Sequence, residues 1–122
     1  MDRKTIFDYA HKVYKSTPEY LWTKYPNYAV LRHGHNNKWY AIIMNVSKDK
    51  LGLDGTEQVD IMNVKCESEM IGSLRMTKGI FAGYHMNKGN WISVLLDGSV
   101  DESMIYNLLD MSFGLTKDKT KK

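Results

Sequence analysis

The chain has 122 residues, 43% of them hydrophobic, and a formal net charge of +3 at neutral pH. This length favours one globular domain with one core, because two domains would each have too little core to be stable. We expect a cytoplasmic protein without a membrane-spanning helix, because the sequence contains neither an apolar run of about 18 residues nor an apolar signal segment.

The first half of the chain predicts a helix followed by a hairpin. In residues 2–16 the apolar positions recur at helical spacing, with Ile6, Ala10 and Val13 on one face and Tyr14 as a further candidate for it. Two segments, 28–33 and 38–46, are rich in aromatic and β-branched residues and are separated by a short polar turn. That pattern is typical of two antiparallel strands.

The second half predicts three more strands and a short helix. Residues 58–66 have the composition of a strand, and residues 67–77 can form a short amphipathic helix. Two further strands, 80–86 and 91–97, are joined by the polar sequence NKGN. We expect Gly89 to supply a positive φ in that tight turn.

The clearest helix is predicted near the end of the chain, over residues 99–113. Ser99 and Glu102 fit a capping box, although Asp101 is an equally suitable N-cap. No internal repeat and no linker interrupts the chain before this helix. We therefore expect one domain over residues 1–114 and a flexible lysine-rich tail over residues 115–122.

These elements predict an α+β two-layer sandwich. Its antiparallel sheet should have about five strands, and the N- and C-terminal helices should cover one face of it. The other face should then be at least partly exposed. Four residues should be buried between the helices and the sheet: Ile6, Val13, Ile105 and Leu109.

Charge is unevenly distributed along the sequence. Residues 115–122 carry four lysines and one aspartate, which leaves residues 1–114 neutral with 13 basic and 13 acidic side chains. Residues 1–48 hold eight basic and three acidic side chains, and residues 71–96 hold three basic and none acidic. This segregation indicates either one positive surface or, after folding, an evenly mixed one.

Four stretches occur in an order and spacing that resemble a known family. They are YAVLRHGHNNKWYAII (28–43), NVKCESE (63–69), GYHMNKGNWISVLLDGSV (83–100) and MIYNLLDMSFGL (104–115). Together they resemble the MmcQ/YjbR family of small bacterial proteins. The resemblance covers nearly the whole chain and includes the pair Ser112 and Phe113, whereas Asn90 stands where the family often has an aromatic residue or histidine. It implies a CyaY-like fold and DNA binding through two hairpin wings.

The two hairpin tips carry the candidate binding residues. If the strand continues to Asn87, His85 and Asn87 point the same way, Lys88 can meet a phosphate, and Trp91 offers a flat surface. The alternative is that these polar groups cap backbone atoms while Trp91 packs in the core. The candidate nucleic-acid-binding residues are Arg32, Lys38, Lys65, His85, Asn87, Lys88 and Trp91.

Metal binding and catalysis have weaker support in the sequence. His33 and His35 share a side if their strand continues, but two imidazoles without a third nearby ligand make a poor metal site. The first predicted helix lacks the acidic ridge of frataxin-like proteins, so we expect no iron and no other cofactor. Cys66 and His85 would be needed for a thiol enzyme, yet a lone cysteine at the end of an apolar strand is usually buried.

The leading functional hypothesis is a non-catalytic DNA-binding protein, monomeric or weakly dimeric and not attached to a membrane. The alternative is a domain that binds a small anionic ligand or a peptide on the exposed sheet face, around Lys65, His85 and Trp91. An enzyme that uses Cys66 is the third hypothesis.

Overall fold

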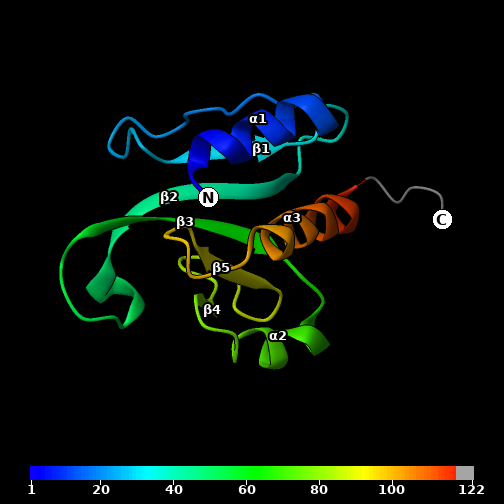
Figure 1. Cartoon of the computed structure of the whole chain (residues 1–122). Helices are drawn as coiled ribbons and strands as arrows, with labels where there is room; N and C mark the ends of the chain where they lie inside the picture. The colour runs from blue at the N-terminus through cyan, green and yellow to red at the C-terminus, as the bar shows by residue number, and fades with distance from the viewer. Residues whose placement is uncertain (118–122) are drawn as a thin grey trace.

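A computed structural model describes residues 1–117. It contains three α-helices, one 3-10 helix and one five-stranded antiparallel sheet with the strand order β1-β2-β3-β5-β4 (Figure 1). The elements are α1 (Arg3–Tyr14), β1 (Ala29–Arg32), β2 (Trp39–Ser47), η1 (Lys48–Leu51), β3 (Gln58–Lys65), α2 (Ser68–Leu74), β4 (Ile80–Ala82), β5 (Trp91–Leu95) and α3 (Glu102–Thr116). The predicted α+β fold with terminal helices is confirmed. None of the helices in residues 1–117 is long and apolar enough to cross a membrane.

The terminal helices α1 and α3 pack on the same face of the sheet, as predicted. Ile6 from α1 and Ile105 and Leu109 from α3 are at most 1% exposed and belong to one core cluster with β2, β3 and β5. Burying such side chains stabilises the fold by about 1.5–3 kcal/mol each. Asp2 begins α1 as its N-cap, because its carboxylate accepts the backbone N–H of Thr5 at 3.0 Å.

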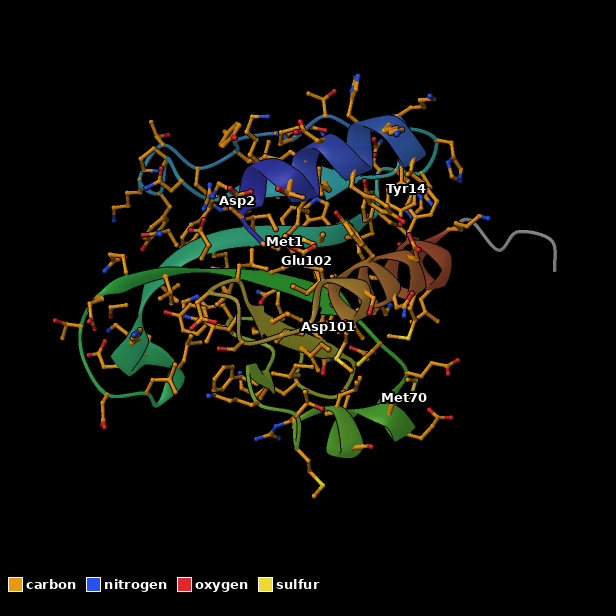
Figure 2. All side chains as sticks on the ribbon, in the orientation of Figure 1. Met1, Asp2, Tyr14, Met70, Asp101 and Glu102 are labelled. Atoms are coloured by element: carbon orange, nitrogen blue, oxygen red, sulfur yellow. The ribbon has the colours of Figure 1, made fainter. Side chains whose placement is uncertain are left out.

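The prediction that Val13 is buried is wrong, because its side chain is 49% exposed. The apolar stripe of α1 runs from Ile6 through Ala10 to Tyr14, each four residues after the last. Tyr14 takes the inner position at the end of the helix, where its ring stacks on Phe113 of α3 with the centroids 4.0 Å apart. Figure 2 labels Tyr14 at the end of α1 nearest to α3.

The last helix, α3, is displaced from its predicted bounds at both ends. Asp101 is its N-cap residue, and Ser99 lies two positions upstream, so the capping box with Ser99 is not formed. The helix continues to Thr116, past the domain end predicted at residue 114, and Thr116 is buried. The remainder of the predicted flexible tail, residues 118–122, lies outside the described residues.

The opposite face of the sheet is covered, although the sequence predicted that it would be at least partly exposed. It carries a second apolar cluster of six side chains, all at most 5% exposed, namely Val30, Ile42, Met44, Val46, Ile61 and Leu95. Three segments outside the strands cover it: residues 17–28, the segment of η1 and its following loop that includes Leu51 and Leu53, and the β4–β5 connection, residues 83–90. These segments have few regular backbone hydrogen bonds, so their apolar residues do not recur at a fixed spacing. Sequence periodicity therefore does not show that they cover apolar surface.

Candidate nucleic-acid interface

Strand register brings the two predicted wings to the same end of the sheet. Arg32 at the end of β1 pairs with Trp39 at the start of β2, and Lys65 at the end of β3 pairs with Trp91 at the start of β5. The turn between β1 and β2 and the β4–β5 connection therefore leave the sheet at one end. The sequence could not establish this, because the pairing of β3 with β5 depends on contacts between distant segments.

The β1–β2 turn presents less free charge than its sequence indicates. The guanidinium of Arg32 makes two hydrogen bonds to the carboxylate of Glu19, at 2.9 and 2.6 Å, which neutralise its charge. Lys38 is exposed and forms no ion pair within residues 1–117. Of the two cations predicted at this tip, Lys38 alone is therefore available to an anion.

One histidine of this turn, His33, is buried against the last helix. His33 is 2% exposed, and its Nε2 lies 2.8 Å from the Thr116 hydroxyl of α3. Burial, with a smaller contribution from His35, lowers the pKa of His33, so the buried ring favours its neutral form. Nowhere in the described part of the chain do three or more His, Cys, Asp or Glu side chains gather as a metal site would require.

The β4–β5 connection is a longer loop than the predicted tight turn. Strand β4 ends at Ala82, and His85 is in the left-handed region with φ 59°. Gly89, which was expected to supply a positive φ, does not have one. The prediction that His85 and Asn87 share one strand face is therefore wrong. Instead, the Asn87 carboxamide oxygen accepts the backbone N–H of Gly89 at 2.8 Å, an Asx-type turn.

A buried polar network holds this loop against the sheet. Asn63 of β3 donates its side-chain N–H to the carbonyl of Tyr84 at 2.9 Å, and its carboxamide oxygen accepts the Ser93 hydroxyl at 2.5 Å. The Ser93 oxygen accepts the backbone N–H of Tyr84 at 2.8 Å. Both side chains are fully buried. Because Tyr84 bonds to these side chains, the segment after Ala82 leaves the strand and forms a loop.

The loop displays His85 and Lys88 on its outer surface. The His85 ring is exposed and stacks on Tyr84, with the centroids 4.1 Å apart. The Lys88 ammonium donates to the carbonyl of Gly83 at 3.0 Å and forms no ion pair within residues 1–117. Trp91 is only half-buried and packs against the second apolar cluster.

An open groove of about 740 Å³, here called the basic groove, lies beside the edge strand β4. Its basic side chains come from three places in the chain: Lys50, then Arg75 and Lys78 between α2 and β4, then His85 and Lys88. Within residues 1–117 no aspartate or glutamate lines the groove, and none of its lysine or arginine side chains is ion-paired. Lys50, Arg75 and Lys78 were not among the predicted site residues, although the acid-free stretch 71–96 was the signal that pointed to two of them.

Lys65 and Cys66 lie apart from the basic groove. They line a separate hollow that also contains Glu67 and Glu69, so carboxylates oppose the Lys65 charge there. Cys66 is 1% exposed, as expected, and burial raises the pKa of its thiol, with a smaller contribution from Glu67. A raised pKa disfavours the thiolate that a nucleophile requires. Slow alkylation of Cys66 stays a prediction.

A third depression, here called the aromatic pocket, lies between residues 17–28 and the β4–β5 connection. It has a volume of about 230 Å³. Ile42 and Met44 of β2 contribute to its lining. The remaining lining side chains are Trp22, Tyr25, Tyr28, Trp39, His85 and Met86. His85 lines both the aromatic pocket and the basic groove, so the two depressions adjoin.

Comparison with known proteins agrees with the fold. A protein of Bacillus subtilis, "Uncharacterized protein YyaQ", is 50% identical over 117 residues, which is 96% of this chain and 99% of that protein. A crystal structure of a Pseudomonas syringae protein is 44% identical with a TM-score of 0.94, over 96% of this chain and all of that one. The Deinococcus radiodurans protein DR2400 is 25% identical with a TM-score of 0.66, over 88% of this chain and 72% of that one.

The family assignment rests on a match over most of the chain. The family model described as YjbR matches residues 11–115, which extend from α1 to near the end of α3. The matched region includes the basic groove, the aromatic pocket and both predicted wings. The chain therefore belongs to the YjbR family.

Proposed function

We propose that this protein binds DNA without catalysing a reaction on it, and that the basic groove meets the phosphates. The observation that carries the proposal is the lining of the groove: four lysine and arginine side chains and His85, with no carboxylate among the lining residues of the described chain. Unpaired cations that line one surface attract a polyanion, because each phosphate contact releases condensed counterions. We also propose that the protein acts in the cytoplasm as a monomer or weak dimer.

This proposal modifies the double-wing hypothesis. The β4–β5 connection contributes Lys88 and His85 to the groove, as a wing would. The β1–β2 turn contributes no residue to the lining of the groove. Of the two cations predicted at that turn, only Lys38 is unpaired in the described chain, because Arg32 is bound to Glu19. The cations supplied from outside the wings, Lys50, Arg75 and Lys78, make up most of the charge on the groove.

Fluorescence anisotropy with a short labelled DNA duplex, measured over a range of salt concentrations, tests the proposal. Three of the four tail lysines must be removed first, since they can bind DNA by themselves, and the chain should end at Lys117. Ending it at Leu115 would delete Thr116, which is buried and bonded to His33. We expect the chain of 117 residues to bind the duplex at low salt.

Charge-removing variants then locate the binding surface. Lys78→Gln should lower the slope of log K against log salt by about 0.9, the contribution of one phosphate contact. The matched control is Lys12→Gln, because Lys12 is an exposed lysine on α1, and this variant should leave the slope unchanged. Absence of duplex binding by the shortened chain at low salt, or equal effects of the two variants, would contradict the proposal.

A small anionic ligand is the second candidate, favoured by the concave shape of the same groove. Thermal-shift measurements with inorganic triphosphate test it. If this candidate is correct, triphosphate raises the melting temperature of the wild type and not that of Lys78→Gln. A shift of equal size in both proteins would count against it.

A further inference from the structure

The aromatic pocket has a composition unlike the basic groove beside it. Its lining contains two tryptophans and two tyrosines, together with Ile42, Met44 and Met86. No lysine, arginine, aspartate or glutamate is among its lining residues in the described chain. Such a pocket favours a flat, largely uncharged group.

The orientation of the rings leaves room for stacking. Trp22 meets Trp39 at 80° and Tyr28 at 75°, with centroid separations of 5.7 and 5.9 Å, so both neighbours meet it edge to face. Tyr25, which stacks on Tyr28 at 4.7 Å, is 49% exposed at the rim. A planar group that enters the pocket can therefore stack on a ring without separating an existing stacked pair of tryptophans.

The charge of the adjoining groove distinguishes between two kinds of ligand that aromatic pockets bind, organic cations and nucleobases. Organic cations also bind aromatic pockets, but Lys88 and the other cations of the adjoining groove would repel them. A nucleobase carries no charge, and its own backbone phosphate would be attracted by the same cations. His85 lines both depressions, so one nucleotide can place its base in the pocket and its phosphate in the groove.

We propose that the aromatic pocket takes one unpaired nucleobase, and that the protein consequently prefers single-stranded to double-stranded nucleic acid. The inference rests on the proposed function, because it requires the basic groove to hold the backbone. A base in a duplex is paired and stacked on its neighbours, and it must be extruded before it can enter the pocket. A base in a single strand enters at much lower cost.

The test compares three labelled probes of equal length by anisotropy at one low salt concentration, on the full chain and on the chain that ends at Lys117. The probes are an oligothymidine, an abasic strand with the same phosphates, and a duplex. We expect the oligothymidine to bind about tenfold more tightly than the abasic strand, the size expected for one base stacked on an aromatic side chain. The duplex should also bind more weakly than the oligothymidine.

Pocket variants test whether this difference arises at the proposed place. Trp22→Ala should weaken oligothymidine binding about tenfold and leave abasic binding unchanged, and Trp22→Phe should restore most of the loss. Tyr25→Ala should act in the same direction with little risk to folding, because Tyr25 lies exposed at the rim. Tyr20→Ala is the matched control, because Tyr20 is 55% exposed in the same segment and does not line the pocket.

The outcomes separate the two proposals. If the oligothymidine, the abasic strand and the duplex bind equally and Lys78→Gln weakens all three, the pocket inference is wrong while the groove proposal stands. If Trp22→Ala and Tyr25→Ala weaken all three probes to the same extent, the inference is also wrong. If no probe binds at low salt, both proposals are wrong.

Discussion

The β1–β2 turn and the β4–β5 connection are alike in sequence and different in structure. Each is a polar, basic segment with histidine and asparagine, and both leave the sheet at the same end. Arg32 of the first is bound to Glu19, whereas Lys88 of the second lies in a groove with no carboxylate in its described lining. A basic tip becomes a candidate anion site only when the fold keeps acidic side chains away from it.

The two regions also differ in how they are attached. His33 of the β1–β2 turn is joined to the end of α3 through Thr116. The β4–β5 connection is joined to the middle of the sheet through Asn63 and Ser93, two buried polar side chains. Buried polar groups that bond to a loop specify one loop conformation, because any other leaves them without partners.

The largest expected effect comes from breaking the attachment of the β4–β5 connection. Asn63→Ala removes the partner of the Tyr84 carbonyl and of the Ser93 hydroxyl inside the protein. We expect the free energy of unfolding, measured by urea denaturation, to fall by about 2–4 kcal/mol. Asn107→Ala, on the exposed surface of α3, should change it by less than about 0.5 kcal/mol. Equal stability of the two variants would show that the network does not hold the loop.

The next largest effect is expected on the salt dependence of DNA binding, which separates the two regions. Removing two groove cations together, with Arg75→Gln and Lys78→Gln, should lower the salt slope of DNA binding by about 1.8. Lys38→Gln in the β1–β2 turn should lower it by at most about 0.9, since it is the single unpaired cation of that tip in the described chain. A larger effect from Lys38→Gln than from the double variant would reverse the assignment of the two regions.

A smaller effect is expected from Arg32→Gln. The ion pair of Arg32 with Glu19 is about one-third exposed, so its loss should cost at most about 1 kcal/mol of unfolding free energy. The salt slope of DNA binding should remain that of the wild type, because the guanidinium is already occupied. Stability from urea denaturation and binding from anisotropy would be measured on the same sample. A fall in the slope would mean that Arg32 releases Glu19 to bind phosphate.

The smallest expected effect is a pH dependence that belongs to the β1–β2 turn. Burial lowers the pKa of His33 below its unfolded value of about 6.5, so the unfolded chain binds a proton more readily. The contribution of neutral His33 to the free energy of unfolding is therefore fully present above that pH and decreases as the pH falls below it. Melting temperatures between pH 7.5 and 5.5 should show this decrease in the wild type and in His85→Ala, and less of it in His33→Gln. Thr116→Val, which removes the hydroxyl that contacts His33, is a second variant whose melting temperature should be measured over the same pH range.

The terminal helices and the strands follow from local sequence patterns. Helical spacing of apolar residues predicted α1 and α3, and β-branched and aromatic runs predicted the strands, because side-chain periodicity and backbone propensity act over neighbouring residues. The error within α1 lies where two positions compete for one place. Val13 and Tyr14 are both near the inner side of α1, and the packing of Tyr14 on Phe113 decides between them.

The candidate interface depends much more on tertiary structure. Residues His85 and Lys88 could be chosen from the sequence, because polar and basic residues in a loop are typical of binding surfaces. Their environment could not be predicted from the sequence, since the basic groove combines Lys50, Arg75 and Lys88 from three separate segments. The pairing of Arg32 with Glu19, 13 residues away, likewise depends on where the chain folds back.

By itself, the sequence determined the fold class, the order of helices and strands and the family resemblance, because these follow from patterns along the chain. Tertiary structure alone decided which charges are free, which face of the sheet is covered and that Trp22, Trp39 and His85 line one pocket. The physical reason is that electrostatic pairing and burial depend on distances through space. In this protein those distances are set by the pairing of β3 with β5 and by irregular segments that have no periodic signal.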